Sequence, residues 1–338
     1  MRGLMALMSL LFCGGLASGQ EVPSGNPADF KIKPCLHSIG YAGLWRGQAQ
    51  LGVEEFLVKA KELGYPSVMI MAKRPHLSPL DYDAAARAKL KRRADELGIT
   101  IAALAGYSDF TAGMDKPGIP NVEMQAAYLG EVAKLANDLG CKMVRVFTGY
   151  ERPGIPYDKQ YGAVVEGLRL AGKEAARHGV TLVVQNHHDI ALHHEAMLWL
   201  IREVNLPNVQ VGWDAWSPTL EGLSAAQIRE SILKLKPHLV NTIAAQYKRH
   251  PRFKYVHELT NYEAQQPVIR ATQMTDPEGI IDYKAFFGTL REIGYRGYLV
   301  YEMCEVLEGG GSIENLDRTA KEFLKFLSSQ LDSGPLIK

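Results

Sequence analysis

The sequence predicts an α/β protein of the (β/α)8 barrel class, built as a single domain. The main observation is a repeated unit in which a charged, helix-patterned segment ends in glycine and an apolar strand follows at once. Glycine in this place is typical of the residue that ends a helix with a positive φ. The five glycines are Gly64, Gly98, Gly140, Gly179 and Gly294. In two further units, proline takes the same place, at Pro207 and Pro237.

Strands that alternate with helices imply right-handed crossovers and a parallel sheet, and eight such strands close most simply into a barrel. The opening strand is expected at residues 36–45, LHSIGYAGLW, and a last helix from Asn315 to Ser328. The helices between the strands are expected to begin near Val53, Tyr82, Val122, Asp158, His194, Ala225 and Tyr283. An open doubly wound sheet is the alternative, disfavoured because no G-x-G-x-x-G motif follows the first strand.

Composition narrows the class of protein. The chain has 338 residues, 46% hydrophobic and 22% charged, which suits one large barrel or two ordinary domains. The formal net charge is +1 and the cations are scattered, so nucleic acid is not expected as a partner. Cys35, Cys141 and Cys304 show no C-x-x-C spacing, so neither a zinc site nor a disulfide framework is indicated. We expect Cys141 and Cys304 to lie buried in strands.

The N-terminal residues have the pattern of a signal peptide. Arg2 precedes a short apolar run, and small residues at Ala17, Ser18 and Gly19 form a cleavage site. We expect residues 1–19 to be removed, residues 20–338 to form the barrel, and the protein to be secreted or periplasmic, with no membrane contact after cleavage. Lipidation at Cys13 and retention of the run as an anchor are the alternatives.

The segment from Lys248 to Glu278, after the seventh strand, lacks clear periodicity and predicts a long loop. Such an excursion is most often a lid or a substrate-binding loop, and the alternative is a structural or oligomer-forming loop. Residues in it that could contact a polyhydroxylated ligand are Tyr255, His257, Glu258, Tyr262, Gln265, Gln266 and Arg270.

Polar residues at the C-terminal ends of the predicted strands should converge at one mouth of the barrel. They are His37, Tyr41, Lys73, Arg74, Tyr107, Asp109, Arg145, Thr148, Gln185, His187, His188, Asp214, Trp216, Asn241, Gln246 and Glu302. Asp214 and Glu302 lie within apolar runs, where a carboxylate is costly to bury unless it is paired or metal-bound. Both are therefore candidate site residues.

Three motifs, GVTLVVQNH, VGWDAWS and GYRGYLVYEM, give the chain a resemblance to the xylose-isomerase-like TIM-barrel superfamily of sugar phosphate isomerases and epimerases. The resemblance implies a sugar-converting barrel enzyme. In that superfamily a divalent ion, often Mn²⁺, Mg²⁺, Co²⁺ or Zn²⁺, is held by Glu, Asp, His and Glu from the fifth to eighth strands. The ion polarises a sugar carbonyl while the two Glu residues move a proton at the adjacent carbon.

Carried over residue by residue, only Asp214 and Glu302 match this metal set. Gln185 replaces the fifth-strand Glu, Ser217 stands where the sixth-strand motif has His, and the seventh strand offers no confident His. Gln185 can offer a carbonyl oxygen but cannot accept a proton, so the usual two-base epimerisation is unavailable. Two possibilities stay open: Asp214, Glu302 and Gln185 bind Mn²⁺, Mg²⁺ or a similar ion, or the site is metal-free.

The expected roles follow from these positions. Glu302 and His187 are the candidate catalytic residues, with Glu302 or His187 as the base. The candidate substrate-binding residues are Arg145, Gln185, Asn241, Gln246 and Trp216. Arg145 would contact either a substrate oxygen or a neighbouring carboxylate, and Trp216 could stack on a sugar face.

Three functions remain from these observations, each with a small carbohydrate as partner and with homo-oligomerisation left open. The first is an exported sugar isomerase or epimerase-like enzyme that abstracts a proton next to a carbonyl. The second is a lyase or hydrolase acting on 3-keto-glycosides or related oxidised sugars. The third is a sugar-binding barrel of reduced catalytic power. An endonuclease IV-like role is disfavoured, because too few His residues are present for a trinuclear zinc site.

Overall fold

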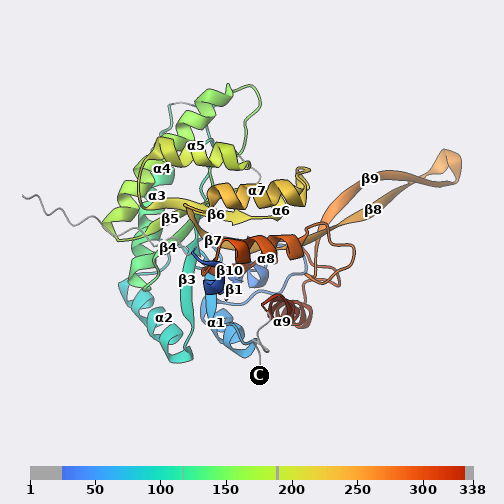
Figure 1. Ribbon diagram of the computed structural model, residues 1–338, viewed down its shortest axis with the longest axis horizontal. Helices are drawn as coiled ribbons and strands as arrows, with labels where there is room; N and C mark the ends of the chain where they lie inside the picture. Colours follow the sequence, from blue (N-terminus) through green and yellow to red (C-terminus); the bar gives the residue numbers. More distant parts are fainter. Residues whose placement is uncertain (1–24, 117, 188–189, 332–338) are drawn as a thin grey trace, which may run out of the picture.

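A closed parallel barrel surrounded by helices forms the body of the protein (Figure 1). The structure, a computed structural model, describes residues 25–116, 118–187 and 190–331. Within these residues eight strands follow the order β1-β10-β7-β6-β5-β4-β3-β2 around the barrel. The predicted single-domain (β/α)8 barrel is therefore confirmed. The predicted signal peptide lies outside the described residues, and no described helix is long and apolar enough to span a bilayer.

The barrel strands and the surrounding helices alternate along the chain. The strands are β1 Lys33–His37, β2 Ser67–Met71, β3 Thr100–Ala105, β4 Met143–Val146, β5 Thr181–Gln185, β6 Val209–Asp214, β7 Leu239–Ala244 and β10 Tyr298–Tyr301. The helices are α1 Val53–Glu62, α2 Ala84–Leu97, α3 Asn121–Asp138, α4 Tyr157–Arg177, α5 His194–Val204, α6 Trp216–Leu220, α7 Ala225–Leu235, α8 Tyr283–Glu292 and α9 Ile313–Gln330. Each helix that the sequence predicted therefore begins within two residues of its expected start.

The repeated glycines end helices, as the sequence predicted. All five glycines have positive φ values, from 62° at Gly179 to 88° at Gly64. At Gly294, a Cβ atom would also lie 2.2 Å from the backbone oxygen of Asn26, so any side chain would collide with the N-terminal segment. A residue with positive φ ends the helix and redirects the chain into the next strand, which explains the regular spacing of the units.

The strands lack hydrophobic alternation because both of their faces are covered. Every residue of β2, β4, β5 and β7 is buried, with one face toward the barrel interior and the other under the helices. The helices are amphipathic in return, and α1 buries Val53, Phe56, Leu57 and Ala60 at helical spacing. The core therefore has two layers, inside the barrel and between barrel and helices.

The prediction for the first strand was wrong in its bounds. β1 ends at His37, and a short 3-10 helix, Ser38–Tyr41, follows where the sequence suggested continued strand. The Nδ1 atom of His37 accepts a hydrogen bond from the backbone N–H of Ile39 at 3.0 Å, which caps this turn. Helix α6, directly after β6, was also not predicted.

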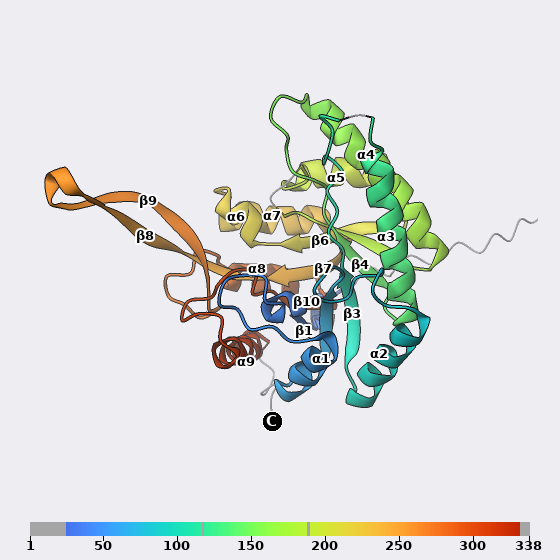
Figure 2. The same cartoon turned by 180° about the vertical axis from the view of Figure 1, so that it is seen from behind.

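The predicted irregular loop after the seventh strand is a long antiparallel hairpin. Its strands are β8, Gln246–Val256, and β9, Asn261–Thr272, and together they extend away from the barrel as an arm (Figures 1 and 2). Tyr255 and Tyr262 pack edge to face with 5.2 Å between ring centroids, yet both are exposed. The prediction of an irregular loop was wrong about the form of this segment, whereas its role as a lid or substrate-binding element stays a prediction; the residues expected to contact a ligand lie mostly on the exposed arm.

Candidate active site

Buried polar side chains gather at the C-terminal ends of the barrel strands, which is where sites in such barrels are built. The set is His37, Arg145, Gln185, Asp214, Asn241 and Glu302. Glu302 has 7% of its surface exposed and the other five have 0 or 1%. A cluster of this polarity at this depth is costly unless ligands or internal partners satisfy it. We therefore take this mouth as the candidate active site.

Asp214, the last residue of β6, is held by neutral partners. One carboxylate oxygen accepts from the backbone N–H of Ser217 at 2.7 Å. The other accepts from Gln185 Nε2 at 2.8 Å and from Ser217 Oγ at 3.2 Å. Burial raises the pKa of Asp214 to about 7, although these hydrogen bonds oppose the shift. Gln185 thus donates its amide to Asp214.

The titration of Asp214 predicts how stability depends on pH. Because the folded-state pKa is above the ordinary value of 3.8, its contribution to stability is complete below about pH 4 and is lost as the pH rises through 7. Asp214→Asn removes this titration, and the Gln185 amide can rotate to face the new side chain. From pH 4 to 8, the free energy of unfolding of the wild type should fall by about 2–4 kcal/mol relative to the variant. Urea denaturation at several pH values measures this, and a constant difference would contradict it.

Glu302 follows β10 directly and is the other buried carboxylate. Its backbone N–H donates to the carbonyl of Ala244 at 2.9 Å, which fixes it beside the end of β7. Its Oε2 atom has no hydrogen-bond partner among the described residues. Burial raises the pKa of Glu302, while the charges of Arg145 and Lys73 lower it. A buried carboxylate with an open oxygen is suited to accept a proton from a ligand.

Two cations share the mouth with Glu302. Arg145, in β4, has its Nη2 atom 3.2 Å from His37 Nε2, and its guanidinium carbon lies 4.1 Å from the ring centroid of Phe147. Lys73 follows β2 and places its Nζ atom 3.7 Å from the ring centroid of Tyr107. The same ring lies 4.9 Å from the guanidinium carbon of Arg145. The mouth is therefore positively charged near Glu302.

An aromatic row borders the charged residues. The ring centroids of Phe147 and His187 are 5.1 Å apart, those of His187 and Trp216 5.9 Å, and those of Trp216 and Tyr247 6.2 Å. His187 also has its Nδ1 atom 3.3 Å from Ser217 Oγ, which itself contacts Asp214. The structure thus brings the predicted His187 and Trp216 together beside Asp214. It adds Phe147 and Tyr247, of which Phe147 was detectable because it lies two residues after Arg145, directly beyond the end of β4.

The remaining predicted residues divide into two groups. Asn241 lies in the middle of β7, is buried, and neither side-chain polar atom has a partner among the described residues. Gln246 instead uses both ends of its amide on the backbone of Tyr247 and Ile281, so nothing in its contacts supports a substrate role. Tyr41, Arg74 and Asp109 bond to Asp317, Asp81 and Arg152, respectively. His188 lies outside the described residues.

The predicted metal set of Asp214, Glu302 and Gln185 does not fit a divalent ion well. Asp214 already accepts three hydrogen bonds, and Gln185 turns a donor toward it where an anionic ligand would be needed. Among the described residues, no three His, Cys, Asp or Glu side chains form a group that could hold a metal. Metal binding by this set stays a prediction, and no step described below involves it.

The cysteines are free thiols in the part of the chain that the structure describes. Cys141 is buried just before β4, so its predicted burial is confirmed, although it precedes the strand. Cys304 lies beyond β10, is partly exposed, and has its Sγ atom 2.6 Å from the hydroxyl of Tyr247. Its placement in a strand was therefore wrong.

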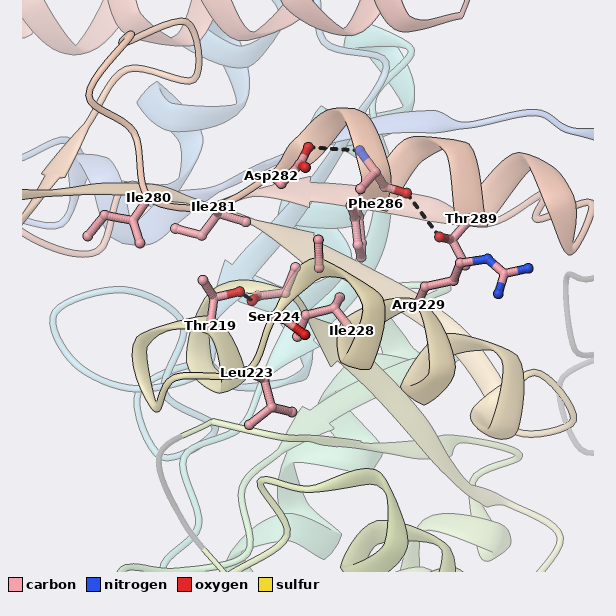
Figure 3. Close-up of a pocket in the computed structure, with 13 residues that line it drawn as sticks. Thr219, Leu223, Ser224, Ile228, Arg229, Ile280, Ile281, Asp282, Phe286 and Thr289 are labelled. Atoms are coloured by element: carbon pink, nitrogen blue, oxygen red, sulfur yellow. Dashed lines mark hydrogen bonds between the residues drawn. The ribbon is translucent and has the colours of Figure 1, made fainter.

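A separate cavity of about 190 Å³ lies between α7 and α8, outside the barrel (Figure 3). Mostly apolar side chains line it, including Ile228, Ile281 and Phe286, with Arg229 at one end. None of the buried charged residues of the mouth lines this cavity. It is a gap in the helical ring and contributes nothing to the candidate active site.

The two buried carboxylates and two cations lie at the C-terminal mouth of the (β/α)8 barrel, where enzymes of this fold have their sites. Residues 57–330 match the family model described as xylose isomerase-like TIM barrel, so the chain belongs to that family. None of the curated protein sequences searched matches the chain.

Solved structures share the fold at low sequence identity. A probable 3-DHS dehydratase, AsbF, from Bacillus anthracis is 15% identical with a TM-score of 0.65, covering 88% of this chain and 99% of its own. D-psicose 3-epimerase, solved in the presence of D-fructose, is 16% identical with a TM-score of 0.64, covering 89% and 99%. The IolI protein, solved with a binding zinc atom, is 16% identical with a TM-score of 0.67, covering 88% and 99%.

Proposed function

We propose that the protein is a sugar isomerase or epimerase-like enzyme that abstracts a proton from the carbon next to a carbonyl, with Glu302 as the base. The observation that carries the proposal is the buried Glu302 carboxylate, whose Oε2 atom has no partner among the described residues. The family and the structural similarity to a sugar epimerase support a carbohydrate substrate. The N-terminal sequence supports a secreted or periplasmic location.

The surroundings of Glu302 suit a base of this kind. Burial raises its pKa, so it gains basicity, while the charges of Arg145 and Lys73 favour the ionised form. Substrate hydroxyl and carbonyl groups would meet the unpartnered Gln185 Oε1, Trp216 Nε1 and both ends of the Asn241 amide. The aromatic row offers an apolar wall for a sugar face, and it excludes water from the reacting carbon.

The contacts favour chemistry with a single carboxylate base. Gln185 cannot accept a proton, and both oxygens of Asp214 are already hydrogen-bonded. An isomerisation needs one base at carbon, since Glu302 can return the proton to the neighbouring carbon on the same face while the proton of the adjacent hydroxyl passes to the carbonyl oxygen. A lyase acting on a 3-keto-glycoside also needs one base, with His187 donating a proton to the departing oxygen. Asp214 is already hydrogen-bonded and is therefore not available as a second base. A lyase, which needs only one base, is for this reason the second candidate.

Proton abstraction is tested directly by isotope exchange. Purified protein in D₂O is incubated with a panel of free keto-sugars and 3-keto-glycosides, and proton NMR follows the hydrogen on the carbon next to the carbonyl. We expect deuterium at that carbon for at least one substrate, with an isomerised or cleaved product. Tight binding of the same sugars without exchange would instead identify a sugar-binding barrel.

A further inference from the structure

We propose that Arg145 and Lys73 form a subsite for a carboxylate group of the substrate, so that the substrate is an acidic sugar of the uronate type. The proposal rests on the proposed function, since it names the substrate class of the same site. It is carried by a buried guanidinium for which no salt bridge is seen within the described part of the chain, and by the donors that surround it.

The guanidinium of Arg145 is fully buried and poorly satisfied. Its exposed fraction is 0%, and its Nε and Nη1 atoms have no partner among the described residues. Removing a guanidinium from water without a counterion costs several kcal/mol. We infer that an anionic ligand bound at the barrel mouth offsets this cost. Arg is also the side chain best matched to a carboxylate, because its planar fork can donate two parallel hydrogen bonds.

His37, a polar neighbour of Arg145, adds a hydrogen-bond donor at this point. His37 accepts the N–H of Ile39 on Nδ1 at 3.0 Å, and burial with the nearby charge of Arg145 lowers the pKa of His37 well below its usual value. A neutral imidazole has one acceptor nitrogen, so His37 Nε2 carries the proton. The 3.2 Å contact between Nε2 and Arg145 Nη2 therefore brings two donors together. An oxyanion beside them would accept from both.

Aromatic rings shape the rest of the subsite. Phe147 and Tyr107 pack against the guanidinium, at 4.1 and 4.9 Å from its central carbon, and leave its N–H edges for a ligand. The Tyr107 ring also lies 3.7 Å from Lys73 Nζ, and its hydroxyl has no partner among the described residues. A carboxylate here would meet the guanidinium, the ammonium and the phenol.

The charge balance favours a monoanion. While Asp214 is protonated, below its pKa of about 7, Arg145 and Lys73 contribute two positive charges and ionised Glu302 contributes one negative charge, which leaves one positive charge in excess. A carboxylate neutralises this excess, whereas a phosphate monoester near neutral pH brings close to two negative charges. The surroundings therefore match a sugar acid better than a sugar phosphate.

The test compares matched sugars that differ in one carboxylate. Isothermal titration calorimetry measures binding of D-glucuronate against D-glucose and of D-galacturonate against D-galactose, with D-glucose 6-phosphate as a separate arm. We expect each uronate to bind at least about tenfold more tightly than its neutral counterpart. Arg145→Met should abolish this preference and Lys73→Met should reduce it. Arg74→Met, which alters an exposed cation paired with Asp81, should preserve the preference.

The outcomes separate this proposal from the proposed function. Equal binding of uronates and neutral sugars, or a preference that survives in both Arg145→Met and Lys73→Met, would overturn the carboxylate subsite. A preference for the phosphate ester alone would overturn it as well. Lys73 is half-buried, so its variant provides a result even if Arg145→Met fails to fold. Glu302→Gln should keep the uronate preference, so loss of exchange chemistry and loss of the subsite are distinguishable.

Discussion

Glu302→Gln is expected to lower the rate of proton exchange next to the substrate carbonyl by about 10²–10⁴-fold, the usual contribution of a positioned general base. The amide keeps the size and burial of the side chain but cannot accept the proton. Substrate binding should change much less, because the replacement leaves the aromatic row and the other polar contacts in place. The measurement is deuterium incorporation in D₂O, together with the dissociation constant of the same sugar.

A matched control lies three residues further along the chain. Glu305 pairs with Arg270 of β9, so Glu305→Gln makes the same chemical change at a carboxylate that already has a partner. We expect this variant to exchange at the wild-type rate. In the wild type, the rate should rise with pH as Glu302 loses its proton, from a pKa that burial has raised. If Glu302→Gln exchanges as fast as Glu305→Gln, Glu302 is not the base.

Gln185→Glu is expected to destabilise the protein in the absence of metal ions and to create a metal site. The new carboxylate would stand where the Gln185 amide now donates to Asp214 at 2.8 Å, so two negative charges would meet in a buried place. At pH 8, we expect a loss of about 2 kcal/mol or more in the free energy of unfolding. The thermal midpoint in EDTA should fall by roughly 5 °C.

A divalent ion should reverse this loss in the variant. Millimolar Mn²⁺ or Mg²⁺ would be held by the carboxylates of residues 185 and 214, and binding to the folded state raises the midpoint by mass action. The same addition should shift the wild type little, because neutral donors already satisfy Asp214. Gln210→Glu, on the same strand as Asp214 but partly exposed, is the charge-matched control. Equal stability of the Gln185→Glu variant and the wild type in EDTA, or no response to the ion, would contradict the prediction.

Much of the fold followed from local sequence signals. The helix starts at Val53, His194, Ala225 and Tyr283 agree with the prediction, because amphipathic periodicity is a property of neighbouring residues. The glycines that end helices also agree with the prediction, because a positive φ at the end of a helix is a local property of the backbone. The arm of β8 and β9 was missed for the opposite reason. Its bulge near His250 and its exposed aromatic residues interrupt the alternation that a strand prediction needs.

The sequence predicted which residues lie at the candidate site, but it did not predict which atoms these residues contact. Polar residues that follow buried strands identify the barrel mouth, so Asp214, Glu302, Arg145 and His187 could be proposed before any coordinates. Which of them are free and which are engaged depends on distances across strands that are far apart in the chain. Gln246 illustrates the limit, since its position suggests a ligand contact while its amide bonds to Ile281, 35 residues away.

The chain's own pattern was sufficient to establish an eight-stranded barrel, its family resemblance and the absence of a carboxylate at Gln185. Those features depend on residue identity and on spacing along the chain. The tertiary structure decided that Gln185 donates to Asp214, that Glu302 keeps an open oxygen, and that Arg145 lies beside His37 and Lys73 without a salt bridge among the described residues. Burial and hydrogen bonding set the charge and availability of each group, and both arise only when the strands close around a common axis.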